Sequence, residues 1–195
     1  MLTETGREVS MRGVGLEEIL QWTGAELVGI LGRPISVSGV STDSRSVAEG
    51  ELFIALKGER FDGHAYVEDA LSKRAGAAVV ERSELARYDR SKGLLLAVDS
   101  GLVAFGKIAA GYRARFDIPV VGITGSAGKT TTKEMVANVL KQRYNVLKTV
   151  NSENNEIGVP HTLLRLDAHH EAVVLELAAR KEGDIHSCLL YTSDA

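Results

Sequence analysis

Cysteine is almost missing from this sequence of 195 residues, since Cys188 is the only one. A single cysteine excludes an internal disulfide, and no cluster of Cys and His has the spacing of a zinc site. Apolar runs long enough to span a membrane are also missing, and residues 1–13 contain no apolar stretch. These absences predict a soluble protein of the reducing cytoplasm, without membrane insertion.

An excess of either charge is missing too. The chain has 23 Lys and Arg against 26 Asp and Glu, which gives a formal net charge of -3. We therefore expect no nucleic-acid partner, and any anion must be bound by a local group of atoms. The hydrophobic fraction of 44% is ordinary for a globular protein. The length allows one large domain or two small ones.

The most informative segment is VVGITGSAGKTTTK, residues 120–133. An apolar, β-branched run breaks at Gly125 and Gly128 and is followed by apolar residues at helical spacing, which is the order of a phosphate-binding loop. Because glycine has no Cβ, the backbone can turn its N–H groups toward a polyphosphate. Lys129 is expected to reach the β- and γ-phosphates, and the Thr130 hydroxyl is expected to bind Mg²⁺.

This loop departs from the general pattern G-x-x-x-x-G-K-[ST], because Ile123 stands at the position of the first glycine. What remains is the shorter variant T-G-x-x-G-K-T-T. The alternative is a glycine-rich turn between a strand and a helix that binds no ligand. A bound polyphosphate would contact the whole loop, which consists of Thr124, Gly125, Ser126, Ala127, Gly128, Lys129, Thr130 and Thr131.

A carboxylate also stands inside an apolar run, at Glu176 in VVLEL (173–177). An uncompensated charge in a buried strand is costly. In open α/β sheets ligands bind at the carboxyl ends of the strands, so Glu176 is predicted to bind Mg²⁺ beside Thr130. The alternative is a glutamate at a strand end that faces water.

Three further polar segments allow a functional and a structural interpretation. Asn154 and Asn155 either form an Asx turn that caps the next helix or line a nucleotide or substrate cleft, and both can hold together. Ser44 and Arg45 either bind a substrate phosphate or diphosphate or lie in a solvated turn. His64, in FDGH, is interpreted as a helix cap rather than a catalyst.

Strand and helix patterns alternate along the chain, which predicts an α/β fold. We place a boundary near Arg115, so that residues 1–114 form a small α/β domain. Residues 115–185 begin a second domain, with a mostly parallel sheet and the phosphate loop. Two short strands are expected on either side of the turn Gly32-Arg33-Pro34. Short apolar runs predict buried strands at residues 77–80, 94–98 and 171–177, and two further strands at residues 120–123 and 146–147.

Five segments, taken in order, resemble the Mur ligases of peptidoglycan synthesis. Within that family, the patterns K-G-x-x-x-D-G-H, T-T-K-E and N-N-E-I-G-V-P favour the member that adds D-alanyl-D-alanine over the one that adds the third amino acid. The resemblance covers nearly the whole chain and is far more specific than the phosphate loop alone. The segments are STDSR (41–45), GELFIALKGERFDGHAY (50–66), GITGSAGKTTTKE (122–134), NNEIGVPHTLL (154–164) and VVLELAARKEGDI (173–185).

The resemblance implies an ATP-dependent ligase with Mg²⁺ as cofactor. The γ-phosphate of ATP goes to the C-terminal carboxylate of UDP-N-acetylmuramoyl-tripeptide, and the amine of D-alanyl-D-alanine attacks the acyl phosphate. Lys129 and Glu176 would be catalytic, because phosphoryl transfer requires positioning and charge neutralisation. Carried over by position, the substrate-binding residues are Ser44, Arg45, Glu59, Arg60 and Phe61 at the uridine diphosphate end, and Asn154 and Asn155 in the central cleft.

The chain also differs from the family pattern. Ala178 stands where the family has glycine, and residues 186–195 do not follow the family and are interpreted as read-through from a truncated gene. The family has three domains, so we expect a monomeric N-terminal fragment that is inactive in ligation, with aggregation or partial disorder after about residue 115. The alternatives are a non-catalytic UDP-sugar-binding module, another Mur-type ligase, and folylpolyglutamate synthase, against which STDSR and FDGH argue.

Overall fold

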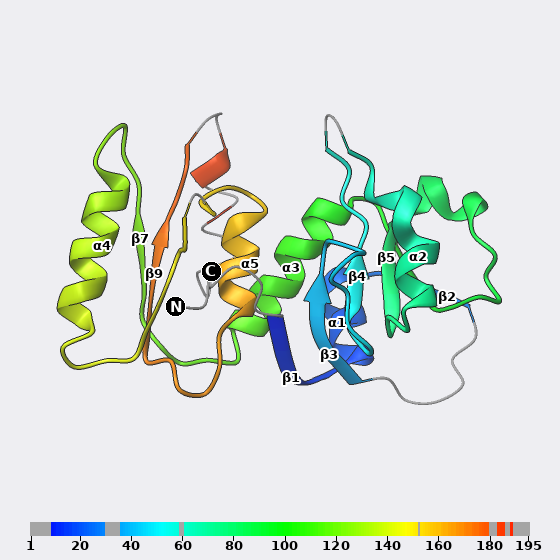
Figure 1. The fold of residues 1–195 in the computed structure, drawn as a ribbon, viewed down its shortest axis with the longest axis horizontal. Coiled ribbons are helices and arrows are strands. Elements are labelled where there is room, and N and C mark those ends of the chain that lie inside the picture. The colour runs from blue at the N-terminus through cyan, green and yellow to red at the C-terminus, as the bar shows by residue number, and fades with distance from the viewer. Residues whose placement is uncertain are drawn as a thin grey trace. The chain divides into compact units, whose positions relative to one another are not determined.

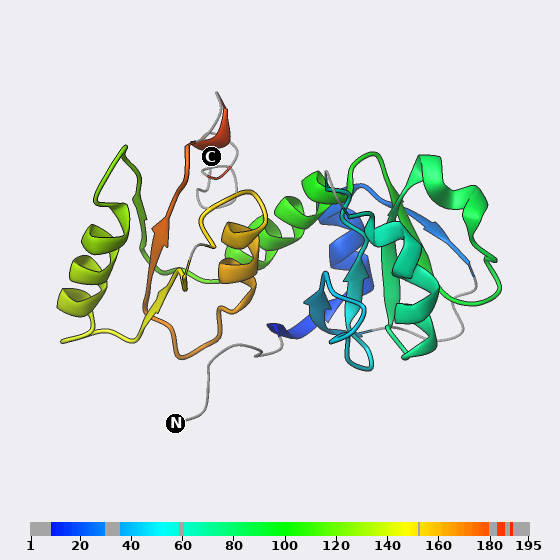
Figure 2. The same ribbon diagram turned by 45° about the horizontal axis from the view of Figure 1, so that its top comes forward.

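The computed structural model divides the chain into two compact units, residues 1–105 and 106–195 (Figures 1 and 2). The division falls inside helix α3 (Gly101–Arg113), and the predicted boundary before Arg115 lies just past the end of that helix. That boundary stays a prediction. The residues described are 9–29, 36–58, 61–151, 153–179, 183–185 and 188.

The first unit is built on a sheet whose central strands are parallel. The spatial order is β1 (Val9–Gly15), β3 (Ser36–Ser41), β4 (Leu52–Ile54), β5 (Ala77–Glu81), β6 (Leu95–Val98) and β2 (Glu26–Val28). The pairs β3–β4, β4–β5 and β5–β6 are parallel, whereas the edge strands β1 and β2 pair antiparallel with β3 and β6. This arrangement confirms the predicted α/β class.

The central strands β5 and β6 are continuous apolar runs, and they are buried. Every residue of β6 is buried, and in β5 only Glu81 is partly exposed, as expected for strands with both faces covered. Helix α1 ends at Gly24, whose φ of 68° is the left-handed conformation that glycine adopts readily. The helical segments of this unit are α1 (Leu16–Thr23), η1 (Gly63–Tyr66), α2 (Val67–Ser72), η2 (Arg82–Arg87) and the start of α3.

The two strands expected around Gly32-Arg33-Pro34 both form, as β2 and β3, but they are not neighbours. β2 pairs with β6 at one edge of the sheet, whereas β3 lies between β1 and β4. The turn itself, residues 30–35, lies outside the described residues. Neither strand pairs with the other. The local sequence pattern does not reveal their actual partners.

The second unit carries a three-stranded parallel sheet in the order β7-β9-β8, which confirms the expected parallel arrangement. Helices α4 and α5 lie on opposite faces of this sheet (Figures 1 and 2). Because the strands are parallel, their carboxyl ends share one edge, where the phosphate loop follows β7. The bounds are β7 (Val120–Ile123), α4 (Lys129–Leu140), β8 (Val146–Lys148), α5 (Gly158–Leu164) and β9 (Ala172–Glu176).

The central strand β9 is buried along its whole length. On one face Ala172 and Val174 pack with Ala137 of α4 and Val146 of β8. Glu176 is the last residue of this strand, so its position is fixed by the packing of the apolar residues before it. Within the described part of the chain, no helix is both long and apolar enough to cross a membrane.

Candidate active site

The segment between β7 and α4 forms the predicted strand, loop and helix. Gly128 is the N-cap of α4 with φ 75° and ψ 0°, and Gly125 has φ 150°. A Cβ on Gly128 would meet nothing within 4 Å, so glycine is favoured there by the backbone conformation rather than by lack of space. Residues 124–128 are all exposed. The loop is therefore open to a ligand.

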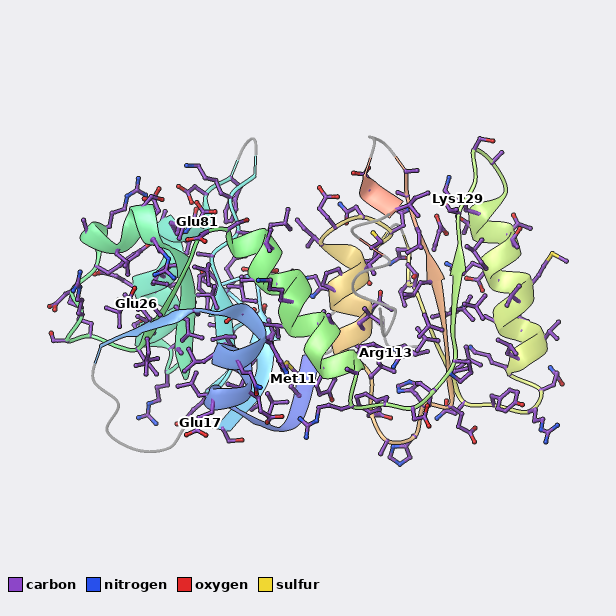
Figure 3. All side chains as sticks on the ribbon, turned by 180° about the vertical axis from the view of Figure 1, so that it is seen from behind. Met11, Glu17, Glu26, Glu81, Arg113 and Lys129 are labelled. Carbon is purple, nitrogen blue, oxygen red and sulfur yellow. The ribbon has the colours of Figure 1, made fainter. Side chains whose placement is uncertain are left out.

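The start of α4 provides donors for an anion. The first N–H groups of a helix have no partner within it, and the N-terminal end carries positive dipole charge. No acidic residue stands in the first turn. Lys129 lies at the turn between β7 and α4 (Figure 3), and its Nζ donates to the Gly125 carbonyl oxygen at 2.7 Å. This cation is thus held across the loop that would receive a phosphate.

Glu176 lies beside the phosphate loop and does not face water, since it is only 3% exposed. Its Oε2 accepts a hydrogen bond from the Thr130 hydroxyl at 2.9 Å, and its Oε1 accepts one from Asn154 Nδ2 at 2.9 Å. The three side chains come from β9, α4 and the loop after β8. The structure therefore brings together Thr130 and Glu176, the two residues predicted to bind Mg²⁺.

Asn155 has the structural role considered for this pair, and Asn154 points toward the candidate site. Asn155 Oδ1 accepts from the backbone N–H of Gly158 at 2.9 Å and so caps the start of α5. Asn154 points to Glu176 instead, and its backbone oxygen accepts from the Ala178 N–H at 2.7 Å. A Cβ on Gly158 would lie 2.4 Å from the backbone of Glu153, so this loop can pack closely only on a glycine.

Lys133 was not singled out by the sequence, yet it lies in the same cluster and is 2% exposed. Its Nζ donates to the Thr149 carbonyl oxygen at 2.9 Å and lies 3.2 Å from Glu134 Oε1 and 3.9 Å from Glu176 Oε2. Thr149 also accepts the Glu176 N–H through its Oγ1 at 3.0 Å. The available signal was helical spacing, since Lys133 precedes the buried Ala137 by one turn.

Glu134 is the second carboxylate of this cluster and pairs with both Lys148 and Lys133. The hydrogen bond from Lys148 lowers the pKa of Glu134 below its usual value, and the hydrogen bond from Lys133 adds to this effect against desolvation. Glu134 therefore stays ionised at neutral pH. The charges of Lys133 and Lys148 thus balance those of Glu134 and Glu176 at this end of the sheet.

The donor atoms at this site fit Mg²⁺ and a polyphosphate. The Thr130 hydroxyl and the Glu176 carboxylate are hard oxygen donors, and Asn154 Oδ1 is buried without a hydrogen-bond partner among the described residues. In the part of the chain that the structure covers, no group of three or more His, Cys, Asp or Glu could hold a metal ion. A site with so few protein ligands suits Mg²⁺, which keeps waters and binds substrate phosphates.

The residues predicted to bind substrate in the first unit are differently exposed. Ser44 is 5% exposed, and its carbonyl oxygen accepts from Lys73 Nζ at 2.8 Å. Arg45 is exposed and forms a bidentate pair with Asp43, through Nε at 2.9 Å and Nη2 at 2.6 Å. Phe61 is exposed, and Glu59 and Arg60 lie outside the described residues.

Phe61 packs on Tyr66, with ring centroids 5.1 Å apart and planes inclined by 11°. Both residues are exposed, Phe61 to 55% and Tyr66 to 42%, so this stacked pair offers an aromatic surface to solvent. The pair lies on the loop and 3₁₀ helix that follow β4. The aromatic surface can stack with a planar ligand group.

His64 has a structural role, and the helix cap is its neighbour Asp62. The Asp62 Oδ1 accepts from the His64 backbone N–H at 3.0 Å and lies 2.7 Å from His64 Nδ1. The Glu81 N–H donates to His64 Nε2 at 3.1 Å, so Nε2 carries no proton and Nδ1 donates to Asp62. The imidazole is fully buried and both ring nitrogens are used.

The Asp43 and Arg45 pair makes a pH-dependent contribution to stability. Hydrogen bonds from the Arg45 side chain and backbone lower the pKa of Asp43 from 3.8 to about 2. Because the folded pKa is the lower one, this stabilisation is present above pH 3.8 and is lost as the pH falls toward 2. We expect Asp43→Asn to abolish this pH-dependent part of the free energy of unfolding. The effect should be less than about 1 kcal/mol, because the pair is exposed.

Urea unfolding of both proteins between pH 2 and 5 measures this effect. The stabilities of wild type and Asp43→Asn should converge as the pH falls. A constant difference over the whole range would show that Asp43 is not held ionised by Arg45.

Comparison with known proteins identifies the family. Residues 36–149 match the catalytic domain of the Mur ligase family, and residues 123–191 match the Mur ligase middle domain. The UDP-N-acetylmuramoyl-tripeptide--D-alanyl-D-alanine ligase of a Synechocystis strain is 47% identical over 155 residues, which are 80% of this chain and 34% of that protein. The chain thus spans about a third of the length of such relatives.

Solved structures agree with this result. The crystal structure of MurF from Acinetobacter baumannii matches with a TM-score of 0.80 and 33% identity, over 90% of this chain and 38% of that one. MurF ligase from Thermotoga maritima, solved in complex with ADP, matches with a TM-score of 0.69 and 39% identity, over 77% and 34% of the two chains. Sequence and structure lead to one conclusion: this chain belongs to the Mur ligase family.

Proposed function

We propose that this chain serves an ATP-dependent ligase that joins D-alanyl-D-alanine to UDP-N-acetylmuramoyl-tripeptide. The observation that carries the proposal is the contact of Thr130 with Glu176 at the end of the phosphate loop. The names of the relatives support this choice of substrates, and the relative solved with ADP supports ATP as the phosphoryl donor. The expected lack of a nucleic-acid partner, the monomeric state and the cytoplasmic location stay predictions.

The chemistry requires an activated carboxylate. The terminal carboxylate oxygen of the tripeptide takes the γ-phosphoryl group, the bond from that group to ADP breaks, and an acyl phosphate forms. The amine nitrogen of D-alanyl-D-alanine then attacks the acyl carbon, inorganic phosphate leaves, and the amine loses a proton. Both steps depend on positioning and on neutralising charge.

The residues of this chain would divide that work. The N–H groups of the loop and of the first turn of α4 would bind the phosphates, and Lys129 would move from the Gly125 oxygen to a phosphate oxygen. Thr130 and Glu176 would hold Mg²⁺, with Asn154 orienting the carboxylate. When bound, Mg²⁺ would offset the charge on the transferring phosphoryl group.

The first unit would bind the UDP end of the substrate. This agrees with the expectation that residues 1–114 form the substrate-binding domain and residues 115–185 the start of the ATP-binding domain. Arg45 is exposed and can exchange Asp43 for a diphosphate, because both present oxygens in the geometry that guanidinium binds. Phe61, stacked on Tyr66, would contact the planar base. Residues 186–195 are given no role.

Titration calorimetry with UDP-N-acetylmuramoyl-tripeptide tests this proposal on wild type and Arg45→Ala. We expect Arg45→Ala to weaken binding by about tenfold or more, because hydrogen bonds to charged groups contribute about 1.5–3 kcal/mol. Arg90→Ala is the matched control, since Arg90 is an exposed arginine of the same unit. If folded wild-type protein does not bind the ligand, the substrate assignment fails and only nucleotide binding remains.

A further inference from the structure

Lys133 is a buried cation beneath the phosphate loop, and its position suggests a task different from that of Lys129. It stands one turn further along α4, on the face that packs on the sheet, and is 2% exposed. Lys129 lies at the exposed loop and reaches over it to Gly125. The Lys133 ammonium is thus directed at the sheet, whereas the Lys129 ammonium spans the loop.

The hydrogen-bonding capacity of Lys133 is directed at the sheet. Its Nζ donates to the Thr149 carbonyl oxygen at 2.9 Å and forms an ion pair with Glu134 Oε1 at 3.2 Å. The distance from Lys133 Nζ to Glu176 Oε2 is 3.9 Å, which makes this contact an ion pair but not a hydrogen bond. Lys133 thus anchors the residue after β8 while placing its charge close to Glu176.

Glu176 needs such a charge because its other contacts are neutral. The Thr130 hydroxyl and the Asn154 amide each donate one hydrogen bond to the carboxylate, whose side chain is 4% exposed. A buried carboxylate without a cationic partner is strongly disfavoured. Among the described residues, Lys133 is the only lysine or arginine within 4.0 Å of Glu176.

We infer that Lys133 is a positioning residue for Glu176: its ammonium holds the carboxylate in place, with Oε2 beside Thr130, before metal and nucleotide bind. This inference rests on the proposed function, in which Glu176 is a ligand of Mg²⁺. Lys133 acts through Glu176 and through Thr149, whose Oγ1 accepts the Glu176 N–H at 3.0 Å. The same lysine thus supports both the carboxylate and the backbone of the metal ligand.

The chain supplies a matched control in Lys148. Lys148 also pairs with Glu134, from β8, and its side chain is partly buried. Its ion pairs within the described residues do not include Glu176. Lys148→Met therefore removes a lysine from the same cluster and the same carboxylate, Glu134, without removing the cation beside Glu176.

The first measurement is a double-mutant cycle on the full chain, which needs no ligand. Urea unfolding is followed for wild type, Lys133→Met, Glu176→Gln and the double variant. The fall in the unfolding midpoint caused by Lys133→Met should shrink to less than half when Glu176 is already neutral. An equal fall in both backgrounds would overturn the inference, because Lys133 would then act only through its other contacts.

The second measurement uses Mn²⁺·ADP as probe, with bound Mn²⁺ counted by electron paramagnetic resonance. Lys133→Met should weaken binding by at least about tenfold, as supporting groups around metal ligands commonly do, and Lys148→Met by less than about twofold. Wild-type affinity in folded Lys133→Met, or equal losses in both variants, would overturn the inference. If wild type itself binds no Mn²⁺·ADP, the proposed function fails, while the cycle still decides the pairing.

Folding of the variants is also decisive. If Lys133→Met does not fold but the double variant does, the charge of Glu176 is what Lys133 compensates, and the inference stands. If neither folds while Glu176→Gln does, Lys133 is a structural residue only and the inference is overturned.

Discussion

Lys129→Ala is expected to weaken the binding of Mg·ADP by roughly 30-fold, equivalent to about 2 kcal/mol for the loss of a charged hydrogen bond. Lys129 is placed by α4, which begins at this residue, and its Nζ already lies over the loop on the Gly125 oxygen. The substitution removes the hydrogen bond to the Gly125 oxygen together with the charge that would bind a phosphate. Titration calorimetry on the two proteins measures the effect.

The control is Lys141→Ala, at the exposed C-terminal end of the same helix. It changes the net charge by the same amount, so a general electrostatic effect would weaken binding equally in both variants. We expect Lys141→Ala to bind within about twofold of wild type, since surface charges are screened over about 10 Å at moderate salt. Equal losses in both variants would contradict a direct role for Lys129.

Phe53→Ala is expected to lower the free energy of unfolding of the first unit by about 3–5 kcal/mol. Phe53 is 1% exposed in the centre of β4 and packs in the main apolar cluster of that unit. Its removal leaves a cavity on the face of the sheet, among the packed side chains of that cluster, which include Val67 and Ala70 of α2. Urea unfolding, followed by circular dichroism, measures the loss.

Phe61→Ala is the matched control, since the same change is made at a ring that is 55% exposed. We expect it to change stability by less than about 0.5 kcal/mol, as surface substitutions usually do. The same variant should weaken binding of UDP-N-acetylmuramoyl-tripeptide if the Phe61 and Tyr66 surface contacts the base. A large loss of stability in Phe61→Ala, or none in Phe53→Ala, would contradict the packing described for this unit.

The parts of the site that follow one another in sequence were predictable. The strand, loop and helix from Val120 to Leu140 follow from an apolar run, glycines and helical spacing, all of which are local properties. The contact of Glu176 with Thr130 was also foreseen, because parallel strands place their carboxyl ends at one edge. This rule holds for parallel sheets in general, so it needs no contact specific to this protein.

The pairing of β2 shows where local pattern fails. Two short strands close in sequence predict a hairpin, yet β2 pairs with β6 and β3 with β1 and β4. Strand identity depends on local alternation of side chains, whereas strand pairing depends on contacts between residues far apart in the chain. The sequence predicted the elements here but not their order.

The sequence by itself determined the α/β class, the phosphate loop, the buried strands and the placing of an acid beside Thr130. Only the tertiary structure decided that Asn154 bonds to Glu176 while Asn155 caps α5, and that Lys133 is buried between Glu134, Thr149 and Glu176. The reason is physical: burial and ion pairing depend on which distant strands meet. In this chain Thr149, after β8, and Glu176, at the end of β9, are the partners of Lys133, and the sequence of α4 does not predict them.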